Sequence, residues 1–372
     1  MKTIFYILTL LSLISCTKTP IDDTKKPPTD SVTTERRNPY RWPFSESSIW
    51  NMPIGSKAVY VAANLEPASR MTVDEDYIVM TPTEPLMKIY TSNVGWGSGD
   101  RCVATGPLLF EAPIPQSWEV SRNTWDGTTP NAGLAVLMTD KRTIKQTQPF
   151  AHCTIGGDAT STYSFPDQDI YGDGLYGAHG GSGLSAVGGA LRYDELTTTS
   201  GPIRHVLKMN VYAAKNLYYD ETTKGFRWPA KTADSNASSV YGKLRTTPSV
   251  KACRMGALLA IPNTIDINTL NLETQPAKIL AQALQDYGAY IVDDTAWDVN
   301  AFITEWGPDG RFKVEFEKNW GFTFTTDGSN AWGKDLKKIM AALHVVDNNS
   351  ESFIGGGGIP RKALAPPFMK MN

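Results

Sequence analysis

The stretch IRHVLKMNVYA, residues 203–213, has the largely alternating apolar and polar side chains of a β-strand. One face of this strand would carry His205, Leu207 and Met209, and the other would carry Arg204, Val206, Lys208 and Asn210. Similar runs at 58–63 and 133–138 are separated by turns rich in Gly, Pro, Asn and Asp. The sequence therefore predicts a mainly β fold, a β-sandwich or jelly-roll-like arrangement with two or more short helices, with α+β as the alternative.

Two segments have helical periodicity instead. Residues 276–287 place five apolar side chains on one face, with Thr274 available as an N-cap and Gly288 as the stop. Residues 335–344 do the same and would end at His344, where a cation suits the helix dipole. Because no internal repeat or boundary is visible, residues 39–372 are expected to form one β-rich globular domain.

The N-terminal residues predict export. Lys2 precedes an apolar run from Ile4 to Ile14, which is too short to span a bilayer, and Ser15 precedes Cys16. This pattern resembles the lipobox of bacterial lipoproteins and predicts a signal peptide at 1–15 and lipidation of Cys16. The alternative is a buried N-terminal element with an ordinary core cysteine.

The segment 16–38, rich in Thr, Lys, Asp and Pro, is expected to be a disordered tether. The expected location is the cell envelope, with the lipid anchor in the outer membrane and the body on its periplasmic or surface face.

Composition limits the classes of molecule that the protein is expected to bind. A formal net charge of −2 without basic clusters argues against nucleic acid, and nothing suggests a stable oligomer, so a monomer is expected. Ten tryptophans and fifteen tyrosines suit a protein that grips sugars, although such residues also pack cores. The cysteines after Cys16 match no zinc or redox motif, and we expect one disulfide and one free thiol among Cys102, Cys153 and Cys253.

Several motifs are spread over nearly the whole chain. They are SIWNMPIG (48–55), GAHGGSGLSAVGGALR (177–192), GPIRHVLKMN (201–210), FRWPA (226–230), ALQDYGAYIVDD (283–294), VVDNN (345–349) and GGGG (355–358). Together they resemble a largely unannotated family of secreted bacterial proteins and lipoproteins that often occur beside carbohydrate-degrading enzymes. The resemblance implies a role in carbohydrate processing and supplies no catalytic residues, so these are sought in the sequence itself.

The segment from Gly172 to Gly189 contains eight glycines. It lacks the Lys-Ser/Thr of a phosphate-binding loop, the G-x-G-x-x-G of a dinucleotide site and the G-x-S-x-G of a hydrolase nucleophile. It is interpreted either as a tight crossing between strands or as a loop that lines a substrate site.

The scarce histidines are candidate catalytic groups. His179 lies within the glycine segment, where it could act as acid, base or ligand. His205 is a second candidate, with a satisfied core histidine as the alternative. His152 follows TQPFA at a predicted strand end and is a candidate substrate-binding residue.

Carboxylates offer a second chemistry, because a glycosidase needs two of them about 5 to 9.5 Å apart across the scissile bond. Asp126 and Glu305 each neighbour a tryptophan, Trp125 and Trp306, that could form a sugar platform. Other candidates are Asp173, Glu195, Asp293 and Asp294. No cofactor is expected. An acidic cluster at Asp167, Asp169 and Asp173 could hold calcium, but its spacing departs from the EF-hand, and a solvated turn is favoured.

These residues predict an exported polysaccharide lyase or glycoside hydrolase, with a non-catalytic glycan-binding lipoprotein as the alternative. In a lyase, Arg192 would neutralise a uronate carboxylate, and His179, His205 or Tyr176 would remove the α proton. Arg204 and Lys208 would help to bind substrate. We expect His179, His205 and Arg192 to share one cleft, unless Arg192 and Glu195 form a structural ion pair and His205 packs inside.

Overall fold

The computed structural model describes residues 35–97, 99–120 and 130–371. Residues Arg36–Asn372 form one compact unit. The predicted signal peptide, Cys16 and most of the predicted tether lie outside the described residues. The ordered body begins earlier than predicted, because Arg37 is buried and its guanidinium donates to the carbonyl oxygens of Pro366 and Phe44. Within the described part of the chain, no helix has the length and apolarity needed to cross a membrane.

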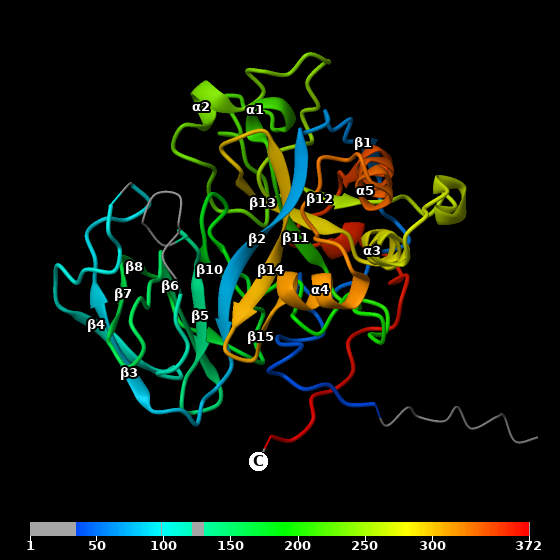
Figure 1. Cartoon of the computed structure of the whole chain (residues 1–372). Helices are drawn as coiled ribbons and strands as arrows, with labels where there is room; N and C mark the ends of the chain where they lie inside the picture. The colour runs from blue at the N-terminus through cyan, green and yellow to red at the C-terminus, as the bar shows by residue number, and fades with distance from the viewer. Residues whose placement is uncertain (1–34, 98, 121–129, 372) are drawn as a thin grey trace, which may run out of the picture. The chain divides into compact units, whose positions relative to one another are not determined.

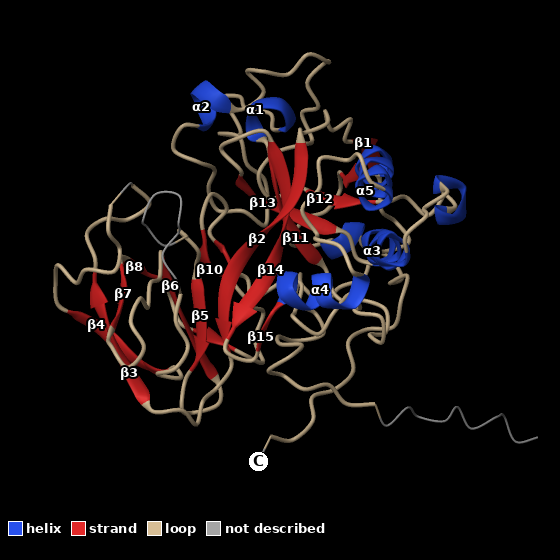
Figure 2. Ribbon diagram, viewed as in Figure 1, coloured by secondary structure: helices blue, strands red, loops and turns tan. Residues whose placement is uncertain are grey.

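The strands form two sheets (Figures 1 and 2). The path of the large sheet is β1-β16-β12-β13-β11-β14-β2-β5-β6-β8, with β15 and β9 paired to β14 and β6. In that order the strands are Tyr60–Ala62, His344–Val346, Leu258–Ala260, Ala289–Asp294, Leu207–Val211, Val299–Gly307, Arg70–Val79, Leu134–Leu137, Thr143–Gln148 and Tyr163–Ser164, with β15 at Gly310–Arg311 and β9 at Gln168–Asp169. The small sheet consists of β4 (Leu108–Pro113), β3 (Leu86–Thr91) and β7 (Ala159–Ser161).

The fold is mainly β with short helices, as predicted. A sandwich-like layer forms where the small sheet packs against β2 and β5, through a cluster that includes Tyr77, Val136, Met87 and Ile89. The centre of the large sheet was not predicted, since β11 pairs with β13, and β14 with β2, in parallel. Strands of this kind are covered on both faces, which explains why all of β11 and most of β14 are buried.

One face of the large sheet is covered by helices α3 (Gln275–Asp286), α4 (Phe312–Trp320) and α5 (Ala331–Ala342), which lie together in Figure 2. Their apolar sides pack on alternate residues of the central strands, in a cluster that includes Leu284, Phe316, Leu336, Met209 and Phe302. The periodicity of 276–287 was therefore predictive. The second helix begins a turn earlier than predicted, and His344 starts β16 instead of ending the helix.

The opposite face of the large sheet is covered by the glycine segment and by residues near Trp50. Trp50 is buried, and its Nε1 donates to the carbonyl oxygen of Gly174 over 2.7 Å. A Cβ added at Gly188 would lie 2.4 Å from that nitrogen, and one added at Gly177 would lie 2.1 Å from Oε1 of Gln146. These glycines are needed because the segment crosses the sheet in direct contact with side chains below it.

Short elements outside the two sheets complete the described structure: β10 (Tyr176–His179), α1 (Ala213–Asn216), α2 (Ala237–Val240) and two 3-10 turns at Ile267–Leu270 and Ile354–Gly356. The cysteine prediction is confirmed, because Cys102 and Cys153 form a disulfide and Cys253 is a free thiol. Burial raises the pKa of Cys253 to about 12, so this thiol is held in its unreactive protonated form.

Candidate functional site

A cavity of about 170 Å³ opens where β2, β13 and the start of β14 meet the glycine segment. Since about 15 Å³ is enough for one water molecule, this space can hold part of a ligand. Five carboxylate residues line it, Asp74, Glu75, Asp76, Asp293 and Asp294, together with His179, Gln148, Trp96 and Trp297. The two tryptophans are 48% and 66% exposed. Two larger hollows, of about 650 and 490 Å³, are lined by residues around 263–285 and 61–64, and neither has a histidine in its lining.

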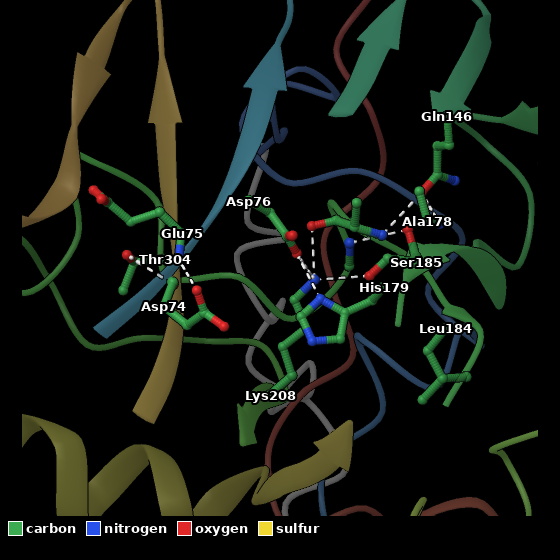
Figure 3. A network of polar contacts seen from close by, with 12 residues as sticks. Asp74, Glu75, Asp76, Gln146, Ala178, His179, Leu184, Ser185, Lys208 and Thr304 are labelled. Atoms are coloured by element: carbon green, nitrogen blue, oxygen red, sulfur yellow. Dashed lines mark hydrogen bonds and ion pairs between the residues drawn. The ribbon is translucent and has the colours of Figure 1, made fainter. Parts of the chain in front are cut away.

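Asp76 is the buried centre of a polar network beneath this cavity (Figure 3). Its Oδ2 accepts hydrogen bonds from Nζ of Lys208 at 2.7 Å and from Nδ1 of His179 at 2.9 Å. Lys208 also donates to the backbone oxygens of Ser185 and Ala186, each at 2.7 Å. The strand β11 thus uses Lys208 to tie the glycine segment to β2, which is a supporting role and not the substrate contact that we predicted.

The charges in this network are matched. Burial alone would raise the pKa of Asp76, but the positive charge of Lys208 and the hydrogen bonds from Lys208 and His179 hold it below its usual value. Burial lowers the pKa of Lys208, and the carboxylate of Asp76 opposes that shift. An ionised Asp76 facing an ammonium group therefore sits at the floor of the site.

His179 links Asp76 to Asn210 and thereby to Asp74. Its Nε2 lies 3.3 Å from Oδ1 of Asn210, whose Nδ2 donates to Oδ2 of Asp74 at 2.9 Å. Both ring nitrogens of His179 thus face oxygen acceptors. His179 lines the cavity as predicted, but this geometry makes it a donor that positions its neighbours, and the base role predicted for it is not supported.

A bulge in β13 brings Asp293 to the same cavity. The register of β13 against β11 shifts after Ile291, so that Asp293, and not Val292, pairs with Asn210. Such a bulge places an extra residue in one strand and redirects the side chains that follow it. Asp293 consequently lies among the side chains on the Asn210 face of the sheet.

Asp293 differs from Asp76 in its electrostatic surroundings. Burial, then the nearby carboxylate of Asp234, holds the pKa of Asp293 well above its usual value. No cation forms an ion pair with Asp293 within the described residues, whereas Asp76 has Lys208. Carboxylates whose surroundings push their pKa values apart are the usual arrangement for a site that needs both a proton donor and an anion.

The predicted cleft of His179, His205 and Arg192 is not formed. Arg192 is buried and pairs with Glu305, its Nε lying 3.0 Å from Oε2, while Nε2 of His205 lies 3.0 Å from Glu195. The hollow beside Arg192 and His205 has a volume of only about 20 Å³. These residues form a structural network, which was the alternative interpretation, although the partner of the Arg192 side chain is Glu305 instead of Glu195.

Other predicted site residues lie elsewhere. The ring of Tyr176 contacts Nζ of Lys231, Arg204 stacks on Trp42, and Trp306 stacks against Arg311. His152 is fully buried between the carbonyl oxygens of Trp118 and Gly157. None of these four predicted residues lines the cavity. Asp126 and Trp125 lie outside the described residues.

The suggested calcium cluster has cations as partners instead. Asp167 pairs with Lys145 and Asp169 with Arg142, while Asp173 accepts a hydrogen bond from the backbone of Leu175. In the described ranges, no group of three or more His, Cys, Asp or Glu side chains has an arrangement that could hold a metal ion.

Sequence reasoning missed Asp74, Asp76, Gln148, Trp96 and Trp297. One signal was available, since the segment TVDEDYIVM places Asp74 and Asp76 two residues apart and therefore on one face of a strand. Charged residues within an otherwise apolar strand are costly to bury unless they pair or serve a ligand. No such signal marks Gln148 or the tryptophans.

Comparisons with known proteins leave the site to be interpreted on its own chemistry. No protein-family model, curated protein or solved structure matches the chain.

Proposed function

We propose that the protein is a glycoside hydrolase that cleaves an uncharged polysaccharide. The observation that carries this proposal is that Asp74 and Asp293 line one cavity whose lining also includes the exposed side chains of Trp96 and Trp297. Paired carboxylates supply the acid and the base or nucleophile of glycoside hydrolysis, and exposed aromatic rings are suited to the apolar faces of sugars.

Asp293 would act as the general acid. Its raised pKa favours the protonated carboxyl group, which can give this proton to the glycosidic oxygen as the C–O bond breaks. Burial raises the pKa of Asp74, so it is the ionised fraction of this carboxyl group that would act on the anomeric carbon, either directly or through a water molecule that it deprotonates. Asn210 and His179 would hold Asp74 in position through their hydrogen bonds.

The charge of the cavity favours a hydrolase over a uronate lyase. Asp74 and Asp294 have no ion-pair partner in the described part of the chain, so a substrate carboxylate would find no paired cation at either of them. The residues that a lyase would need, Arg192 and Tyr176, do not line the cavity.

A glycan-binding protein without catalysis is the second candidate, and the exposed aromatic residues favour it. Trp96 stacks on Tyr163 with 4.3 Å between ring centroids, which makes a rigid platform beside the cavity. Binding alone would not require a proton donor in the cavity, and this difference can be tested at Asp293.

The cellular location remains part of the proposal. The apolar run before Cys16 and the resemblance to secreted bacterial lipoproteins support a lipid anchor on Cys16 and a place in the outer membrane. There the enzyme would act on polysaccharide at the cell envelope.

The test uses the full-length protein and the variant Asp293→Asn. Xylan, galactomannan, arabinan, laminarin, alginate and polygalacturonate are incubated with both, while reducing ends and the absorbance of unsaturated uronates are followed. We expect reducing ends from an uncharged polysaccharide and a loss of about 100-fold or more in the variant, because the proton donor is gone. The control Asp167→Asn, at an exposed carboxylate paired with Lys145, should keep full activity.

The same experiment can overturn the proposal. Hydrolysis by Asp293→Asn at the wild-type rate would remove Asp293 from the chemistry. Unsaturated products from alginate or polygalacturonate would indicate a lyase, and saturable binding of an uncharged polysaccharide with no cleavage would indicate the binding protein.

A further inference from the structure

Gln148 is a buried side chain whose acceptor is unused. It is only 6% exposed, lies at the end of β6 and lines the cavity. Its Nε2 donates to the carbonyl oxygen of Asn131 at 3.0 Å, whereas its Oε1 has no hydrogen-bond partner among the described residues. A buried acceptor left without a donor destabilises the folded protein. Such a group is explained if a ligand supplies the donor.

The orientation of this amide is fixed. A carbonyl oxygen can only accept, so the Gln148 amide must turn its NH₂ group toward Asn131. Reversing the amide would set two acceptors against each other. The group that remains for a ligand is therefore an acceptor.

The free acceptor lies close to the proposed acid. A Cβ at Gly180 would be 3.1 Å from Oδ2 of Asp293, and 3.7 and 3.8 Å from Nε2 and Oε1 of Gln148, so the carboxyl and the amide group both lie within 4 Å of one point. Because residue 180 has no side chain, nothing from this position separates them. A single sugar unit can therefore contact both groups.

We propose that Gln148 determines the substrate class of this site. Its Oε1 accepts a hydrogen bond from a hydroxyl group of the sugar beside Asp293. The site therefore binds neutral sugars and rejects uronates. This inference rests on the proposed function, since it assigns the substrate of the same cavity. A uronate carboxylate at this point is an acceptor and has no donor to offer Oε1 of Gln148. A hydroxyl group has the donor that Gln148 lacks.

Two substitutions separate recognition from structural support. Gln148→Met keeps the size of the side chain and removes both the donor and the acceptor. Gln148→Glu keeps an acceptor for the substrate and removes the donor to Asn131. If Gln148 only supports the fold, Gln148→Glu should impair activity at least as much as Gln148→Met, because the new carboxylate would face the carbonyl oxygen of Asn131.

The measurements use the full-length protein and the neutral polysaccharide that it hydrolyses best. For Gln148→Met we expect KM to rise roughly 3- to 10-fold, the loss of one neutral hydrogen bond. For Gln148→Glu we expect KM within about 3-fold of wild type. The alkaline limb of its pH profile should move to higher pH, because a second negative charge near Asp293 favours the protonated acid. Gln282→Met, at a half-buried glutamine on α3 that bonds Asp286, is the control and should behave as wild type.

Failure of this inference is distinct from failure of the proposed function. If Asp293→Asn is inactive while Gln148→Met retains the wild-type KM and the wild-type preference for neutral over uronate substrates, the hydrolase stands and the role of Gln148 is rejected. If KM rises equally in Gln148→Met and Gln148→Glu and the pH profile of Gln148→Glu does not move, the recognition role of Gln148 is also rejected, and the residue only supports the fold. An active Asp293→Asn variant would reject the proposed function itself.

Discussion

Lys208 is fully buried, and its ammonium group satisfies one carboxylate and two backbone carbonyl oxygens. Removing one partner of such a pair leaves an uncompensated charge and typically costs about 3 to 5 kcal/mol. Lys208→Met should therefore lower the free energy of unfolding at pH 7 by roughly that amount. Urea denaturation followed by circular dichroism measures it. The matched control is Asp169→Asn, which breaks the exposed pair with Arg142 and should change the free energy of unfolding far less.

The same pair predicts a pH dependence. The folded-state pKa of Asp76 is depressed, so its stabilising contribution is present above the unfolded pKa and is lost as pH falls through the folded value. In Lys208→Met the ammonium is absent, and burial should instead raise the pKa of Asp76. The stability difference between wild type and variant should consequently narrow as pH falls from 7 to 4. If the stability difference between wild type and Lys208→Met stays constant from pH 7 to pH 4, Asp76 does not form an ion pair with Lys208.

At the scale of elements, the glycine segment and β6 depend on each other. Gln146, a buried residue of β6, accepts hydrogen bonds through Oε1 from the backbone nitrogens of Ala178 and Ala186. A Cβ at residue 177 would lie 2.1 Å from this oxygen. The segment can only cross here because residue 177 has no side chain.

Gly177→Ala should therefore destabilise the protein by about 1 to 3 kcal/mol, the usual range for overpacking a filled interior. Gly201→Ala is the control, since a Cβ at residue 201 meets nothing within 4 Å. Thermal denaturation of both variants compares them. Equal midpoints would mean that the crossing has room to adjust and that the close contact is not structurally required.

Local patterns in the sequence predicted local structure. Alternation in 203–213 correctly placed Lys208 and Asn210 on one face, and the 3.6-residue period of 276–287 found α3. Proximity in sequence also brought Glu195 to His205. The candidate site failed because His179 contacts Asp76, 103 positions earlier in the chain. Parallel pairing of β2 with β14 and the bulge in β13 leave no short-range signature, and they decide which side chains reach the cavity.

At the scale of the whole body, the last residues hold the first ones in place. The backbone nitrogen of Arg37 donates to Pro367, and that of Met369 donates back to Arg37. Arg37 also binds the carbonyl oxygen of Phe44, and the backbone nitrogen of Phe44 donates to Ile170, just before the glycine segment. The C-terminal residues are thus linked, through Arg37 and then Phe44, to the segment that leads into the glycine segment beside the cavity.

Removal of residues 348–372 should therefore lower the thermal midpoint by roughly 5 °C or more, because Arg37 loses its hydrogen bond to the carbonyl oxygen of Pro366 and its backbone hydrogen bonds with Pro367 and Met369. Removal of residues 370–372 is the control and should leave the midpoint unchanged, since Met369 keeps its bond to Arg37. The larger truncation should also weaken hydrolysis of the neutral polysaccharide, because it removes Ile354, which packs against the cluster that contains Phe44, Trp50 and the glycine segment. Circular dichroism and reducing-end assays on both truncated proteins measure the two effects. If the protein without residues 348–372 has the same thermal midpoint as the wild type, the residues after Asp347 contact the body without stabilising it.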